Sequence, residues 1–162
     1  MPVRSTRAAS PMLATAAATL PVGPDWTYEV KWDGYRALAI KDGARVKLAS
    51  RNDKDLTREF PALARAVAAL PIEHAVLDGE IVALDGDGRP SFQALQHRAL
   101  EGHVVVFYAF DLLAEDARSW LAEPLAERRI ALASLLQRAS AVVQTDTSTV
   151  LLSEPLPGDA AT

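Results

Sequence analysis

Four charged residues with close spacing, Glu29, Lys31, Asp33 and Arg36, are candidates for chemistry. A lysine amine is a nucleophile only without its proton, and an isolated lysine with a pKa of about 10.4 is almost entirely protonated near neutral pH. A nearby arginine, a metal-polarised phosphate or partial burial would lower that pKa, which makes Lys31 a candidate nucleophile. The structural alternative is a solvated charged strand face followed by an ordinary Asp-Gly turn.

The segment that carries Lys31 alternates apolar and charged residues, which predicts a strand over residues 27–32. Its apolar face would lie against a core, and its other face would carry Glu29, Lys31 and Asp33. The Asp33–Gly34 pair then ends the strand. Arg36 follows two residues later and would place a positive charge near Lys31.

Three other short sequences contain candidate binding residues. Arg51 lies in Ser-Arg-Asn at the end of a predicted strand, and Phe110 closes an aromatic run before an aspartate. Asp78 and Glu80 share one face of a predicted strand, as a common metal or ribose site requires. Each has a structural alternative when taken alone: a surface cation, a core ring and a solvated pair of carboxylates.

The composition is that of one globular domain: 162 residues, of which 49% are apolar and 23% charged. The absence of cysteine excludes disulfides, cysteine metal sites and thiol catalysis. A net charge of −4 argues against a simple basic nucleic-acid module. Residues 1–51, however, hold eight Lys and Arg against four Asp and Glu, so phosphate contacts are expected there. No apolar stretch approaches the length of a membrane span, so no membrane partner is expected.

Strands and helices are predicted to alternate along the chain after an N-terminal arm over residues 1–24. A Lys41-Asp42-Gly43 turn between two short strands is a strong hairpin signal, and Pro61 suits the first turn of a helix. The predicted strands are 37–40, 45–50, 74–84, 104–113, 142–143 and 150–152, and the predicted helices are 57–70, a short one from Ser91, and 125–136.

The order of these short sequences resembles ATP-dependent DNA ligases. The K-x-D-G-x-R pattern at 31–36, the S-R-N at 50–52, the D-G-E at 78–80 and the aromatic run at 107–113 follow one another as in that family. The P-M-L-A at 11–14 is similar to the entry to the adenylation (nucleotidyltransferase) domain of the bacterial end-joining type. The resemblance covers residues 11–136. It implies an α/β (α+β) fold with antiparallel sheets flanked by helices and an ATP-grasp-like nucleotidyltransferase core.

The resemblance also implies roles for particular residues. Lys31 would attack the α-phosphate of ATP and carry AMP, which it would pass to a 5′-phosphate before the break is sealed. Glu29 and Phe110 would bind adenine, and Arg36 and Glu80 would bind the ribose. Arg51 would bind a phosphate, and Glu80 would also bind Mg²⁺ or Mn²⁺. The implied partners are nicked or broken double-stranded DNA and other end-joining repair proteins, in the bacterial cytoplasm at the nucleoid.

The chain departs from the ligase pattern after its first third. It has no lysine after Lys54, so the E-G-x-x-x-K and K-x-K motifs of such ligases are absent. The expectation is a partial adenylation domain over residues 25–162, incomplete at its C-terminus and without an OB-fold domain. A catalytically silent nucleotide-binding remnant, a structural partner of another chain, and an RNA-ligase or capping-type nucleotidyltransferase stay open as alternatives.

Overall fold

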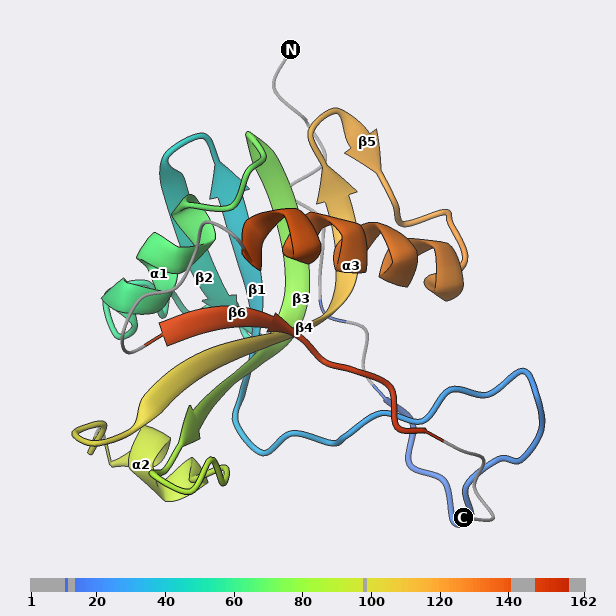
Figure 1. Cartoon of the computed structure of the whole chain (residues 1–162), viewed down its shortest axis with the longest axis horizontal. Coiled ribbons are helices and arrows are strands. Elements are labelled where there is room, and N and C mark those ends of the chain that lie inside the picture. The colour runs from blue at the N-terminus through green and yellow to red at the C-terminus, as the bar shows by residue number, and fades with distance from the viewer. Residues whose placement is uncertain (1–10, 12–13, 98, 141–147, 158–162) are drawn as a thin grey trace.

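A curved six-stranded sheet forms the centre of the computed structural model, which describes residues 11, 14–97, 99–140 and 148–157 (Figure 1). The strand order is β2-β1-β3-β4-β5, and β6 pairs with β4 outside this path. The strands are β1 Tyr35–Asp42, β2 Arg45–Ser50, β3 His74–Leu84, β4 Val104–Glu115, β5 Arg118–Ser119 and β6 Ser148–Leu152. The helices are α1 Pro61–Ala68, α2 Phe92–Gln96 and α3 Leu125–Ser140.

Most neighbouring strands in the sheet are antiparallel. The β1–β2 hairpin turns at Gly43, whose φ of 58° is in the left-handed region that glycine adopts without strain. Strand β6 differs, since it runs parallel to β4. Strands β5 and β6 share one edge of β4, with β6 along its first half and β5 at its end. The sheet is therefore mixed, and the α+β fold class predicted from the sequence is confirmed.

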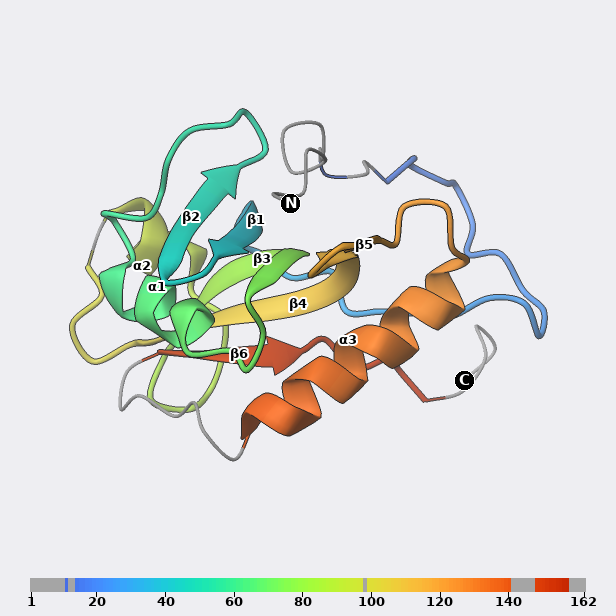
Figure 2. The same ribbon diagram turned by 90° about the horizontal axis from the view of Figure 1, so that it is seen from above.

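The main hydrophobic core lies between one face of the sheet and helices α1 and α3 (Figure 2). Period-two alternation sends Ala37 and Ala39 of β1 and Phe107 and Ala109 of β4 into this core. Intervening residues such as Arg36 therefore face the opposite side of the sheet, where their side chains line a cleft.

Two predicted elements differ from the structure. Residues 27–32 do not form a strand, because no neighbouring strand pairs with them; one isolated bridge joins Glu29 to Pro155. The helix predicted over 57–70 is shorter and begins at Pro61, because residues 56–60 form turns in which Leu56 and Phe60 are buried. The strand predicted at 142–143 lies outside the described residues. The other predicted strands and helices are confirmed, with small shifts at their ends.

Within the described ranges, no helix combines the length and the apolar composition that crossing a bilayer requires.

Candidate functional site

A cleft of about 660 Å³ opens on the face of the sheet opposite the main core. It brings together every residue to which the ligase resemblance assigns a role, although these residues come from four separate stretches of the chain, and Asp33 does not line it. The lining residues are Ala14, Glu29, Val30, Lys31, Trp32, Arg36, Arg51, Asp78, Glu80, Phe110, Asp111 and Leu125. The sequence thus predicted the convergence of these side chains, and their chemical roles stay predictions.

The segment that carries Lys31 is held by side-chain contacts together with one isolated backbone bridge, rather than by continuous strand pairing. The Trp32 ring stacks on Tyr108 of β4, with 3.7 Å between ring centroids and 4° between ring planes. The indole Nε1 of Trp32 donates a hydrogen bond of 2.9 Å to Ser153 Oγ, in the segment after β6. Because strand alternation does not apply here, Val30 and Lys31 both line the cleft, and the predicted division into an apolar and a charged face is wrong.

Close backbone approach explains the glycine in two of the Asp-Gly pairs, Asp33–Gly34 and Asp78–Gly79. A Cβ atom on Gly34 would lie 2.1 Å from the carbonyl oxygen of Ile81, and one on Gly79 would lie 2.5 Å from the carbonyl oxygen of Tyr108. The absence of a side chain at Gly34 also lets its N–H donate to Glu80 Oε1 at 3.2 Å. The two glycines therefore bring the Lys31 segment onto β3, and β3 onto β4.

Arg36 and Asp78 form a two-pronged ion pair on the floor of the cleft, with nitrogen–oxygen distances of 2.7 and 2.9 Å. The guanidinium of Arg36 also lies 4.4 Å from the centre of the Phe110 ring, in a cation–π arrangement. The pKa of Asp78 is raised, since burial disfavours its charged form by more than Arg36 restores. Asp78 is thus committed to Arg36, which argues against the predicted metal or ribose site shared by Asp78 and Glu80.

Glu80 remains the candidate metal ligand. Burial raises its pKa, while Arg36 and the N–H of Gly34 act in the opposite direction. Among the described residues, no group of three or more Asp, Glu or His side chains is placed to hold a metal ion. A single carboxylate such as Glu80 fits Mg²⁺ only together with a bound nucleotide, since that ion is commonly held by one or two carboxylates together with substrate phosphates and water.

The cations predicted to meet phosphate are placed at the cleft with their charges available. Lys31 and Arg51 are both exposed and, in the part of the chain that the structure describes, take part in no hydrogen bond or ion pair through their side chains. Arg51 also borders a neighbouring hollow of about 460 Å³, which Ser50, Asn52 and Lys54 help to line. This placement gives an anionic ligand two cations to meet in the cleft.

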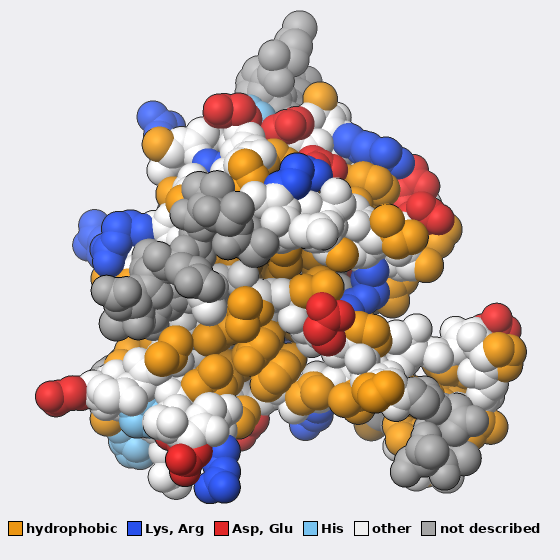
Figure 3. All heavy atoms as spheres, viewed as in Figure 1, with side chains coloured by type: hydrophobic (Ala, Val, Ile, Leu, Met, Phe, Trp, Pro, Cys, Tyr) orange, Lys and Arg blue, Asp and Glu red, His pale blue; other side chains and the backbone are white. Residues whose placement is uncertain are grey.

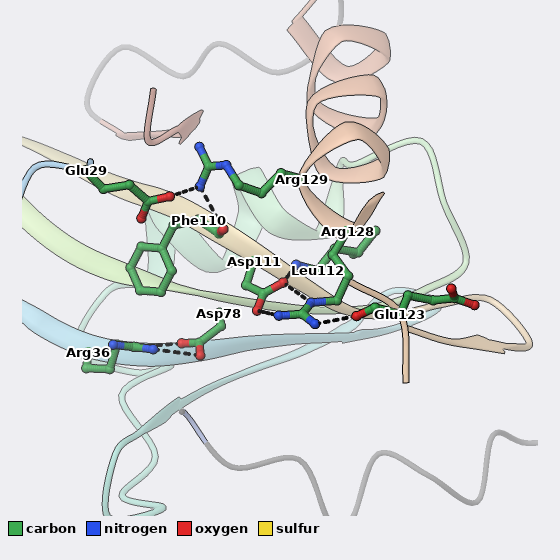
Figure 4. Close-up of polar contacts among 9 residues, drawn as sticks. All are labelled: Glu29, Arg36, Asp78, Phe110, Asp111, Leu112, Glu123, Arg128 and Arg129. Carbon is green, nitrogen blue, oxygen red and sulfur yellow. Dashed lines mark hydrogen bonds and ion pairs between the residues drawn. The ribbon is translucent and has the colours of Figure 1, made fainter. Parts of the chain in front are cut away.

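Two arginines of α3 hold the cleft together, and from the sequence they were assigned to a structural helix rather than to the site (Figure 4). Arg128 binds both carboxylate oxygens of Asp111, at 2.7 and 2.9 Å. Arg129 pairs with the Glu29 carboxylate and donates to the carbonyl oxygens of Phe110 at 3.0 Å and Ser153 at 2.6 Å. The signal for the first pair was available: an aspartate inside an apolar strand needs a buried partner.

Comparison with known proteins identifies relatives along nearly the whole chain. The profile of the "ATP dependent DNA ligase domain" family matches residues 11–154. The multifunctional non-homologous end joining DNA repair protein LigD of Mycobacterium tuberculosis is 40% identical over 153 residues, which are 94% of this chain and 19% of that protein. DNA ligase C of the same species is 41% identical over 133 residues, covering 76% of this chain and 36% of that protein.

Solved structures agree with these matches. The ligase domain of Mycobacterium tuberculosis LigD superposes with a TM-score of 0.78 at 40% identity, over 94% of this chain and 48% of that one. A mycobacterial DNA ligase D complexed with ATP and MES gives a TM-score of 0.80 at 39% identity, over the same shares. The chain thus spans about half of the ligase domains and about a fifth of the LigD proteins that it matches. It belongs to the family of ATP-dependent DNA ligase domains.

Proposed function

We propose that the cleft binds ATP and that Lys31 accepts its AMP, as the first step in sealing breaks in double-stranded DNA. The observation that carries this proposal is the convergence on one cleft of an exposed lysine, a second exposed cation at Arg51 and an accessible aromatic face at Phe110. The solved mycobacterial DNA ligase D is a complex with ATP and MES, which supports the same ligand here.

The proposed nucleotide pose follows from the chemistry of the lining residues. The Phe110 ring offers a stacking surface for adenine, and the Glu29 carboxylate offers an acceptor for its 6-amino group. Arg36 lies beside the ring and Glu80 lines the same cleft, and both would bind the ribose hydroxyls. Arg51 would neutralise phosphate charge.

The chemical step forms a bond between Lys31 Nζ and the α-phosphorus. The bond from that phosphorus to the oxygen bridging to the β-phosphate breaks, pyrophosphate leaves, and the amine loses its proton to solvent. The fixed segment around Trp32 contributes orientation, because a nucleophile that is already held near its target loses less entropy on reaching the transition state. A Mg²⁺ ion held by Glu80 and phosphate oxygens would supply charge neutralisation at the phosphates.

The later steps are proposed from the relatives. Their names describe DNA ligases and non-homologous end joining DNA repair proteins. We therefore propose nicked or broken double-stranded DNA as the acceptor of AMP, other end-joining proteins as partners, and the bacterial cytoplasm, at the nucleoid, as the location.

Peptide mapping tests the nucleophile directly. After incubation with ATP and Mg²⁺, AMP is expected on Lys31 alone and is expected to be lost in Lys31→Ala. The other three lysines have partners: Lys41 is buried against the carbonyl oxygens of Gly43 and Ala68, Lys47 pairs with Asp53, and Lys54 pairs with Glu59. Lys47→Arg is the matched control and should be labelled as the unsubstituted chain is. AMP on any lysine other than Lys31 would contradict the proposal.

A further inference from the structure

Arg129 contacts three separate segments of the chain at once, and Figure 4 shows two of these contacts, to Glu29 and to Phe110. Its guanidinium pairs with Glu29 of the nucleophile segment, donates to the backbone of β4 at Phe110 and donates to Ser153 after β6. The Arg129 side chain is only 13% exposed, whereas the Glu29 carboxylate that it contacts is 31% exposed and borders the cleft. One partly buried cation therefore holds the Glu29 carboxylate and the backbone of Phe110 together.

The same cation also controls the protonation of Glu29. Burial raises the pKa of Glu29, as does the neighbouring carboxylate of Asp111 on β4, while Arg129 lowers it through its charge and its hydrogen bond. A carboxylate can only accept hydrogen bonds, whereas a protonated carboxyl group can also donate one. Without Arg129, burial and Asp111 would still favour the protonated form of Glu29. The Glu29 side chain would also lose the contact that holds it in place.

We propose that Arg129 determines which purine the cleft accepts, by keeping Glu29 in place beside Phe110 as an obligate hydrogen-bond acceptor. Such an acceptor binds the 6-amino group of adenine and repels the 6-carbonyl of hypoxanthine or guanine. Arg129 is a positioning residue here, since it acts through Glu29 and lines no part of the cleft itself. The inference rests on the proposed binding of ATP.

The charged groups around Glu29 make the direction of a pH effect clear. Arg129 faces it from α3 and Asp111 from β4; Lys31 and Asp33 belong to its own segment. Across the cleft lie Arg36, Arg51, Asp78 and Glu80. Arg129 is the cation that lowers the pKa of Glu29. Without it, Glu29 binds a proton at higher pH, so a base with a 6-carbonyl should be tolerated better as the pH falls.

Calorimetric titration of the 162-residue chain with ATP and with ITP, which carries a 6-carbonyl, tests this proposal. The unsubstituted chain should bind ATP more tightly than ITP. Arg129→Gln should lower this preference about tenfold, as expected for a lost charge-assisted hydrogen bond, and by more at pH 6 than at pH 8. Arg129→Lys keeps the charge but cannot reach all three acceptors. The preference of this variant for ATP over ITP should therefore lie between those of the unsubstituted chain and Arg129→Gln.

Two further variants separate selectivity from folding. Arg138→Gln removes an arginine of the same helix that bonds to Ser134 and Glu115 instead, and it should keep the full preference. Glu29→Gln should lower the preference as much as Arg129→Gln, and the double variant should lower it no further, because both act on one contact.

The outcomes are distinguishable. Equal weakening of ATP and ITP by Arg129→Gln and Arg129→Lys, or an unchanged ratio in both, would overturn the role of Arg129 while leaving ATP binding intact. In the nucleotide-free chain, nuclear magnetic resonance should show a higher pKa for Glu29 in Arg129→Gln than in the unsubstituted protein, and an unchanged value would also overturn the inference. An unsubstituted chain that binds neither nucleotide would instead contradict the proposed function, and the selectivity inference with it.

Discussion

Three carboxyl groups of the cleft, Glu29, Asp78 and Glu80, have raised pKa values for a common reason. Burial disfavours the charged form of each by more than its arginine neighbours restore. The cleft thus holds negative charge at a cost to stability, in the place where the proposed ligand would bring Mg²⁺. Such a cost at a functional site is common, because stability and function set different demands on the same side chain.

The raised pKa of Glu80 gives a stability prediction with a definite sign. A carboxyl group whose folded pKa is raised binds more protons when folded, so its destabilising effect is present above the folded pKa and disappears as the pH falls through it. The difference in unfolding free energy between Glu80→Gln and the unsubstituted chain should therefore favour the variant more at pH 7 than at pH 4. Urea unfolding followed by tryptophan fluorescence at the two pH values measures the difference.

Asp85 provides a control of opposite sign. Its pKa is lowered by hydrogen bonds from the backbone of Arg89 and Asp87, so it contributes stability above its unfolded pKa that is lost as the pH falls through its folded pKa. Relative to the unsubstituted chain, the unfolding free energy of Asp85→Asn should therefore be lower at pH 7 than it is at pH 4. The same sign in both variants would contradict the assignment of the Glu80 shift to burial.

The accessible ring of Phe110 leads to a second prediction at the residue scale. Stacking of a base on an aromatic ring contributes about 1–3 kcal/mol, so Phe110→Ala should weaken ATP binding roughly tenfold or more. Calorimetry measures the affinity, and circular dichroism shows whether the variant is folded. Trp26→Ala removes an aromatic residue that is 56% exposed and does not line the cleft, and it should leave the affinity unchanged. Unchanged affinity in a folded Phe110→Ala would mean that the ring serves only to support Arg36.

At the scale of elements, the strands that carry the site could be predicted well. The hairpin of β1 and β2, the long strand β3 and the apolar strand β4 follow from alternation, turn residues and β-branched content. The Lys31 segment could not, because its alternation is compatible with a strand but its actual contacts are a ring stack with Tyr108 and a hydrogen bond to Ser153. Alternation describes the faces of a strand only where a neighbouring strand pairs with it.

The junction of β3 and β4 at Gly79 gives a prediction for these elements. A Cβ atom there would lie 2.5 Å from both the Phe107 ring and the carbonyl oxygen of Tyr108, so Gly79→Ala forces two central strands apart. Overpacking of this kind costs about 1–3 kcal/mol of unfolding free energy, which urea denaturation measures. Gly86→Ala is the matched control, since a Cβ at Gly86 meets no atom within 4 Å, and its effect should stay within about 0.5 kcal/mol. Equal effects in the two variants would show that the close approach is not required.

At the scale of the molecule, charge and apolar surface are unevenly distributed. Figure 3 shows hydrophobic side chains gathered around the position of β6, and the exposed large hydrophobic residues of β6 and β4 are Leu151 and Val104. The cations of the cleft, Lys31, Arg36 and Arg51, all come from the first third of a chain whose net charge is −4. The net negative charge of the chain opposes binding of a DNA backbone, which carries negative charge itself.

The 162-residue chain by itself is therefore expected not to seal nicks. It has no lysine after Lys54, and loss of a single cation that stabilises a transition state can cost around 3 kcal/mol. Its DNA binding should be weak and should fall further with added salt. A labelled nicked duplex with ATP and Mg²⁺ provides the assay, with Lys31→Ala as the blank. Robust joining that depends on Lys31 would show that the residues of this chain suffice.

The candidate nucleophile, the family resemblance and the strands that carry the predicted site could all be inferred from the sequence, because they depend on residue types at short spacing. How the site is held together could be seen only in the folded chain. Glu29 and Arg129 are 100 residues apart in sequence, and Trp32 and Ser153 are 121 apart. No local pattern links such pairs, because the burial and charge that make them partners arise only after β4, α3 and the segment following β6 have packed around the cleft.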